Sequence, residues 1–247
     1  MGNNNKNTGT CGPDITDWFV EEVNIHMALF QRYTAGALFK LVIFARYAKR
    51  LAYKYLRFRS PQCPCQNCLD TVTLCGVCVH VSDIGNIMFG AMGKIWLGTE
   101  PLIIACGAAA ARRSSTGGID SVADMASSVA GLQLGRSILR QGISNINRQI
   151  LCSAITVTDQ PFVNRLKEYF TGNALDWLNS IGSNPLRTIA VNRCTPCTQS
   201  LSLQAPHSNF AWIQEPRDLS RAIQQWWQTY QGMNNNGIDN SGIPWNE

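Results

Sequence analysis

The sequence predicts a mainly α fold, in which a compact helical domain with a cysteine-rich loop or short hairpin packs against a smaller, mixed C-terminal portion. Apolar residues recur at helical spacing after capping residues, and the strand-like stretches are only four or five residues long. The chain has 247 residues, of which 45% are hydrophobic, enough for a packed core. We divide it into a flexible N-terminus (1–10), the helical domain (11–150), a helical and mixed extension (151–231) and a loose tail (232–247).

The first half of the chain predicts two helices and a hairpin. Asp14 and Thr16 are good N-caps, and the apolar residues that follow at helical spacing predict a helix to about Tyr33. Residues 35–58 are apolar at first and then basic and aromatic, which indicates a long amphipathic helix, either packed in the core or lying on a membrane or on phosphates. Residues 71–74 and 77–81 read as short strands.

The remaining elements follow from capping signals and periodicity. Asp83 would cap a helix beginning near residue 84, Pro101 lies in the first turn of another, and Asp120 would cap a third. The predicted helices are 84–97, 100–113, 121–144, 161–181 and 219–230. Residues 186–204 alternate and are β-like around Cys194 and Cys197.

Ten cysteines allow two interpretations. Five of them lie between residues 63 and 78, and Cys194 and Cys197 form a distant CxxC pair. This spacing could supply a tetrahedral zinc site, but the short separation of Cys68 from Cys75 leaves little room for paired zinc knuckles. The even count suits disulfides formed in an oxidising compartment, and we favour them without assigning pairs.

Charge and hydropathy restrict the partners and the compartment. The net charge of +5 and the pI near 8.7 suit an anionic partner such as nucleic acid, cell wall or membrane surface. The first ten residues are polar, not those of a signal peptide, and the most apolar run, residues 35–45, is too short to span a bilayer. Export would therefore need a dedicated secretion apparatus or a carrier protein. Walker, HExxH and GxSxG motifs do not occur.

Asp83 and Asn86 stand out because they lie in an apolar run that also contains Gly85, Gly90 and Gly93. Gly90 and Gly93 fall on one helical face, where another backbone or a substrate can approach closely. The simplest explanation is that Asp83 caps the helix and that the glycines let helices pack. The alternative is that the polar pair forms part of a functional site.

Asp120 and Asp124 are four residues apart and would share one helical face. Two carboxylates at that spacing repel unless they bind a proton, a cation or an arginine. They can equally be an N-cap and a residue that favours the helix dipole.

Several motifs in the same order resemble one known family. They are C-G-P-D-I-T at 11–16, T-V-T-L-C-G-V-C at 71–78 and D-x-G-N-x-x-x-G-x-x-G at 83–93, followed by Asp120 and Asp124. Over residues 11–136 the chain resembles the bacterial polymorphic toxin type 44 domains. Many relatives carry an acidic residue immediately before the Asp, where this chain has Ser82. The resemblance implies an antibacterial secreted effector, delivered into a target cell and neutralised in its producer by a cognate immunity protein.

Three functions remain open from the sequence. The first is a muramidase-like hydrolase that cleaves the glycan strands of peptidoglycan in the target periplasm without a metal or cofactor, with Asp83, Asp120 and Asp124 as catalytic residues and Asn86 as a substrate-binding residue. The second is a nuclease toxin of the target cytoplasm, in which the three aspartates would hold a metal and the basic segment would bind nucleic acid. The third is a membrane-perturbing toxin that uses residues 35–58.

Overall fold

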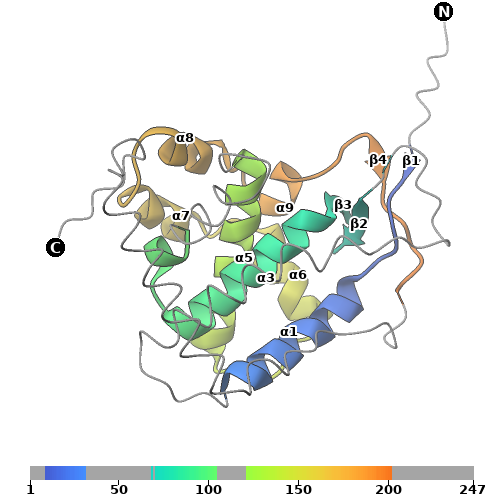
Figure 1. The fold of residues 1–247 in the computed structure, drawn as a ribbon, viewed down its shortest axis with the longest axis horizontal. Helices are drawn as coiled ribbons and strands as arrows, with labels where there is room; N and C mark the ends of the chain where they lie inside the picture. Colours follow the sequence, from blue (N-terminus) through green and yellow to red (C-terminus); the bar gives the residue numbers. More distant parts are fainter. Residues whose placement is uncertain (1–8, 32–67, 69, 105–120, 202–247) are drawn as a thin grey trace, which may run out of the picture.

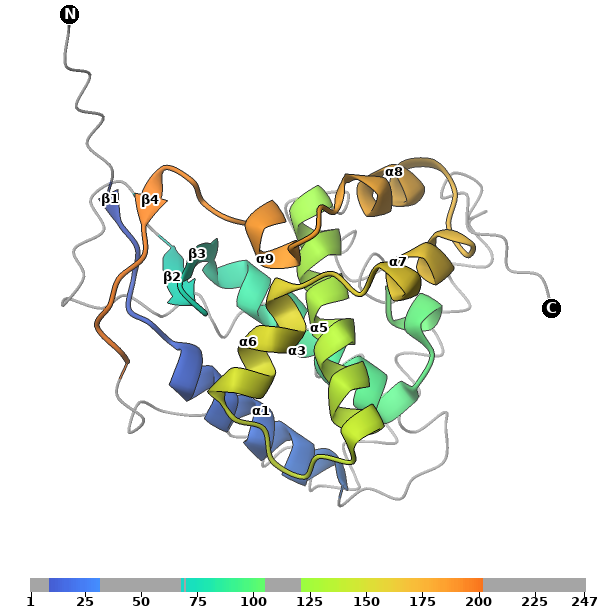
Figure 2. The ribbon, with the colours of Figure 1, turned by 180° about the vertical axis from the view of Figure 1, so that it is seen from behind.

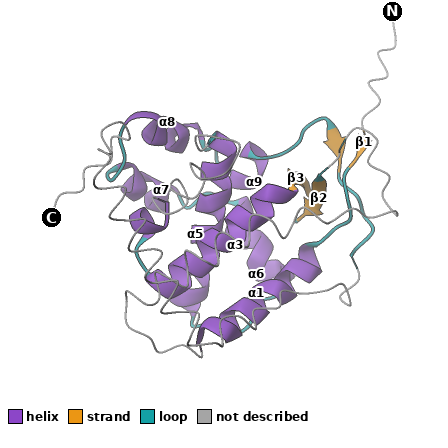
Figure 3. Cartoon of the chain, viewed as in Figure 1, coloured by secondary structure: helices purple, strands orange, loops and turns teal. Residues whose placement is uncertain are grey.

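The fold is known from a computed structural model, which describes residues 9–31, 68, 70–104 and 121–201 (Figure 1). Its elements are α1 (Thr16–Gln31), α3 (Val81–Leu97), α5 (Val122–Gln141), α6 (Arg148–Thr156), α7 (Gln160–Lys167), α8 (Gly172–Ser180), α9 (Pro185–Thr188), and the strands β1 (Gly9–Thr10), β2 (Thr71–Leu74), β3 (Val77–His80) and β4 (Cys194–Thr195). Figure 3 shows that most of the described chain is helical and that the short strands lie together at one end of the molecule. The predicted fold class is thereby confirmed.

Helices α3 and α5 form the centre of the molecule, where they cross obliquely (Figure 1). They run in the same direction, since their contacts advance together along both helices. A Cβ on Gly90 of α3 would collide with the backbone of Ser128 in α5, and one on Gly131 of α5 would collide with the carbonyl of Ile87. Only glycine permits this close approach of two backbones. Gly90 therefore serves helix packing, one of the two uses that the sequence left open.

The cysteine-containing hairpin is confirmed as the antiparallel pair β2–β3, with Thr71 opposite His80 and Leu74 opposite Val77. Its two-residue turn, Cys75-Gly76, has positive φ at both positions (50° and 73°), as a type I′ turn requires. Cysteine is unusual at the first of these positions. Here the Cys75 amide donates to the Thr16 hydroxyl (2.8 Å), and a disulfide joins Cys75 to Cys152.

The first predicted helix, confirmed as α1, lies along one edge of the molecule and packs on α3 and α6 (Figure 2). Two predicted caps were wrong. His80 occupies the N-cap of α3 and Ser121 that of α5, so α3 begins three residues earlier than expected. The periodicity of residues 84–97 shows the helix body, but a histidine cap gives little sequence signal.

The single helix predicted over 161–181 is also wrong, because α7 and α8 are separate. Gly172 begins α8 with a φ of +56°, which an α-helix cannot continue through. Asp159 caps α7 by accepting from the amide of Phe162 (3.1 Å). Helix α6 was not predicted. The β-like character expected around Cys194 and Cys197 is present as β4, which pairs in parallel with β1.

Residues beyond 150 contribute to the same hydrophobic core as the earlier ones. Leu151, Phe162 and Leu186 are at most 1% exposed and belong to one cluster with Ile84 and Leu132. The boundary at residue 150 falls inside α6 and stays a prediction. The predicted helices 35–58 and 219–230, most of 100–113 and the tail 232–247 lie outside the described residues; residues 100–104 are helical.

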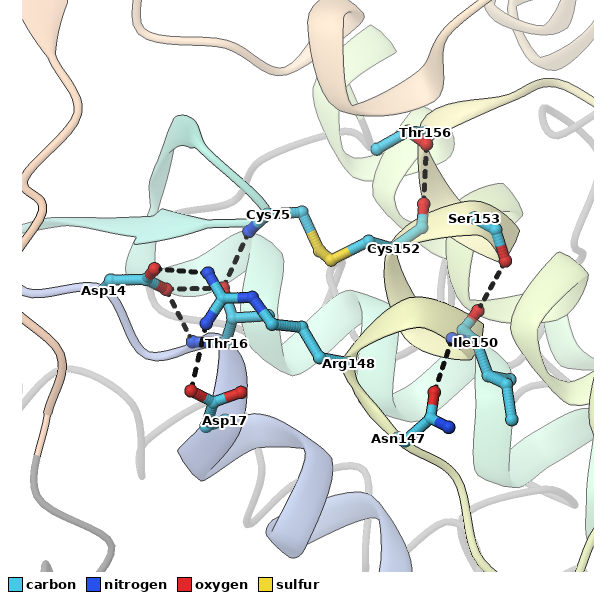
Figure 4. Close-up of a disulfide and its surroundings, with 10 residues drawn as sticks. All are labelled: Asp14, Thr16, Asp17, Cys75, Asn147, Arg148, Ile150, Cys152, Ser153 and Thr156. Carbon is cyan, nitrogen blue, oxygen red and sulfur yellow. Dashed lines mark hydrogen bonds and ion pairs between the residues drawn. A yellow bond between two sulfur atoms is a disulfide. The ribbon is translucent and has the colours of Figure 1, made fainter.

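Disulfides, favoured over zinc from the sequence, are present. They join Cys11 to Cys78, Cys68 to Cys194 and Cys75 to Cys152, and Cys197 is also disulfide-bonded. Two of these bridges link the hairpin region to residues beyond 150. In Figure 4, α6 is held at two adjacent points: by the Cys75–Cys152 bridge and by Arg148, whose guanidinium donates to Asp14 (2.7 Å) and Asp17 (3.0 Å).

Candidate functional site

The candidate site is built from the first turns of α3 and α5, which lie side by side because the two helices run in the same direction. Asp83 and Asp124 occupy the same position, N3, of their respective helices. Each carboxylate accepts a hydrogen bond from the backbone amide at its own helix N-cap: His80 to Asp83 (3.2 Å) and Ser121 to Asp124 (3.1 Å). Each cap fixes the position of its own carboxyl group, and the packing of α3 against α5 brings the two groups close together.

Asn86, predicted to bind substrate, connects the two helices. It lies one turn after Asp83 on α3 and donates its amide to Oδ1 of Asp124 across the interface (2.9 Å). The other oxygen of Asp124 accepts from the Ser121 hydroxyl (2.9 Å). Hydrogen bonds from Asn86 and Ser121 therefore fix the orientation of the Asp124 carboxylate from both sides.

Asp83 is the perturbed member of the pair. The residue is only 4% exposed. Burial, and secondarily the negative charge of Asp124, raises the pKa of Asp83 to about 7, and the His80 amide and the Ser127 hydroxyl offset part of that rise. Asp83 therefore holds its proton for much of the time at neutral pH.

Ser127 is a site residue that the sequence analysis missed. It is fully buried one turn after Asp124 on α5, beside Asp83. Its hydroxyl donates to the carbonyl of Ala123 (2.9 Å) or Asp124 (3.0 Å). The same hydroxyl lowers the pKa of Asp83, which means that it can donate its one proton to the ionised Asp83 carboxylate in place of these helix carbonyls. A Ser at i+3 from the Asp was the available signal, but serines are common in helices.

The structure brings together three of the four predicted site residues. Asp83, Asn86 and Asp124 come together, while Asp120 lies outside the described residues. Among those described, no group of three carboxylates or histidines gathers around Asp83 as a metal site would need; the one group with metal-ligand geometry is formed by cysteines.

Two other features lie apart from this pair. A groove of about 370 Å³ lies at the far end of α5, with Gln133, Arg136, Arg140 and Asp159 among its lining residues. On α1, Glu22 and His26 are fully buried one turn apart, with Oε1 of Glu22 3.3 Å from Nε2 of His26, while Glu21 is exposed. Adjacent residues of a helix point about 100° apart, so only one of the two glutamates faces inward, and it is Glu22.

Comparisons with protein-family models, with curated proteins and with solved structures found no match to this chain. The likeness to type 44 toxins therefore stays a prediction that rests on the motifs. Among the described helices, none is long and apolar enough to cross a membrane. The segment 35–58, on which the membrane-perturbing hypothesis depends, lies outside the described residues.

Proposed function

We propose that the chain is an antibacterial effector that hydrolyses the glycan strands of peptidoglycan in the periplasm of a target cell. The observation that carries the proposal is the pair Asp83–Asp124. One carboxyl is buried with a pKa raised to about 7, and its neighbour is part-exposed and held by Asn86 and Ser121. Glycoside hydrolysis needs one carboxyl that holds its proton and one that is ionised.

The chemistry assigns a role to each group. Asp83 donates its proton to the glycosidic oxygen as the bond to the anomeric carbon breaks. Asp124 either takes a proton from the attacking water or attacks the anomeric carbon itself, and Asn86 keeps it in position. Asp83 is 4% exposed, so a sugar reaches it past the part-exposed side chains of Asn86 and Asp124.

The disulfides favour a periplasmic over a cytosolic site of action, because the cytosol keeps thiols reduced. The positive charge of the whole chain suits the anionic cell wall. A cognate immunity protein and a secretion apparatus or carrier are the partners that this function requires.

The test is expression in a bacterium with and without a periplasmic export signal, comparing the wild type with Asp83→Asn. Asp176→Asn is the matched control, since Asp176 is an exposed aspartate on a different helix, α8. We expect killing only of cells that export the protein, loss of killing in Asp83→Asn, and release of muropeptides from purified peptidoglycan by wild type and control. Killing only by the protein that lacks the export signal would overturn the proposal and favour the nuclease.

A further inference from the structure

Four cysteines form a buried cluster of their own, separate from the main hydrophobic core. Cys11, Cys68, Cys78 and Cys194 are between 0% and 7% exposed, and Val191 packs against them. The disulfides Cys11–Cys78 and Cys68–Cys194 lie against each other, since the sulfurs of Cys11, Cys78 and Cys194 are all within 4.8 Å of one another. Three distant segments of the chain thus bring the four cysteines together in one buried cluster.

We propose that in the reduced chain these four cysteines bind one zinc ion, and that oxidation replaces the metal with the two disulfides. A tetrahedral site with Zn–S distances of about 2.3 Å separates its sulfurs by roughly 3.8 Å. The sulfurs of Cys11, Cys78 and Cys194 already lie within 4.8 Å of one another, and the sulfur of Cys68 is bonded to that of Cys194. Four thiolates are also a complete ligand set for structural zinc. The proposal does not depend on the catalytic function.

The backbone holds the cluster together independently of the sulfur oxidation state. The Cys11 amide donates to the carbonyl of Thr195 (2.8 Å), and the Val191 amide donates to the carbonyl of Cys78 (2.8 Å). The Thr71 hydroxyl donates to the carbonyl of Cys68 (2.6 Å). None of these bonds involves a sulfur, so reduction of the disulfides does not remove them.

The reaction balances in both directions. Four thiols release four protons as they bind Zn²⁺, and the metal site carries a net charge of −2. Oxidation forms two S–S bonds and frees the zinc; four electrons pass to two molecules of an exogenous disulfide oxidant, which take up four protons and become thiols. In a reducing cytosol the zinc form would hold the segments together before the disulfides can form.

The experiment uses the full chain, reduced with a phosphine under argon and loaded with ZnCl₂, then separated from free metal. We expect about one zinc per chain, and on treatment with an alkylating agent and peptide mapping, protection of Cys11, Cys68, Cys78 and Cys194 that a chelator abolishes. Oxidised glutathione should release the zinc and restore the two disulfides. The absence of bound zinc, or zinc protection of a different set of cysteines, would overturn the proposal.

Variants provide a second test. Cys78→Ser should lose most of the bound zinc, whereas Cys152→Ser should keep it, because the Cys75–Cys152 bridge lies outside the cluster. Cobalt substitution then reports thiolate coordination directly, through intense charge-transfer absorption that is present in the wild type and in Cys152→Ser. If Cys78→Ser binds cobalt with an unchanged spectrum, the assignment of the ligands is wrong.

Discussion

At the residue scale, the buried position of Asp83 has a thermodynamic consequence. Its pKa is about 7 in the folded chain and close to 3.8 when exposed. Between about pH 4 and pH 7 the folded chain therefore binds a proton that the unfolded chain has released, and the free energy of unfolding falls as pH rises. The contribution that is lost across this window is about 4 kcal/mol.

Asp83→Asn should remove this dependence, because the amide does not ionise while its oxygen can still accept from the His80 backbone. We expect the variant to be more stable than the wild type at pH 8, and the difference between them to shrink toward pH 4. Urea unfolding at a series of pH values measures this difference. A difference that stays constant across the pH series would show that Asp83 ionises normally.

The same group sets a pH limit on the proposed catalysis. Asp83 acts as a general acid only while it is protonated, so hydrolysis of peptidoglycan should decline tenfold per pH unit well above pH 7. Asn86→Ala frees Oδ1 of Asp124 from its amide partner and should lower kcat without abolishing this decline. A rate that stays flat to pH 9 in the wild type would argue against Asp83 as the acid.

At the element scale, the contact between α3 and α5 determines whether the site exists at all. A methyl group added at Gly131 would overlap the carbonyl of Ile87 and approach the amide of Ala91 (2.9 Å). Both are backbone atoms within a helix, so the two helices must move apart. The first turns that hold Asp83 and Asp124 would then separate.

Gly131→Ala should therefore lower the free energy of unfolding by about 3 kcal/mol, at the upper end of overpacking costs. It should also lower the pKa of Asp83, because the charge of Asp124 would be more distant. Gly182→Ala is the control, since its new methyl would meet only the Thr188 hydroxyl at 4.0 Å. Equal stability of the two variants in urea unfolding would contradict this account of the interface.

These elements also show what the sequence could predict. The spacing of apolar residues predicted the central parts of α1, α3 and α5. The two short strands on either side of Cys75-Gly76 were also predicted from the sequence. The pairing of Asp83 with Asp124 depends on the packing of α3 against α5 in the same direction, which is a tertiary property and leaves no local pattern. The break at Gly172 was missed because apolar spacing continued across it, and the disulfide partners were unreadable because distant segments supply them.

At the scale of the whole molecule, the chain can be one cooperative unit or two domains that meet near residue 150. The core favours one unit, since Leu151 and Phe162 pack in the same cluster as Ile84 and Leu132. The Cys75–Cys152 bridge closes a separation of 77 residues across the proposed boundary. Cross-links of that length stabilise a protein chiefly by restricting its unfolded chain.

Replacing both Cys75 and Cys152 by Ser distinguishes these arrangements. In a single unit the double variant should lose about 2–4 kcal/mol of stability and still unfold in one transition, because the shared core and the ion pairs of Arg148 with Asp14 and Asp17 remain. Two independent domains would instead separate into two transitions once this cross-link is gone. Calorimetry compares the van't Hoff and calorimetric enthalpies, and their equality in the double variant would show that residues beyond 150 fold together with the helices that carry the site.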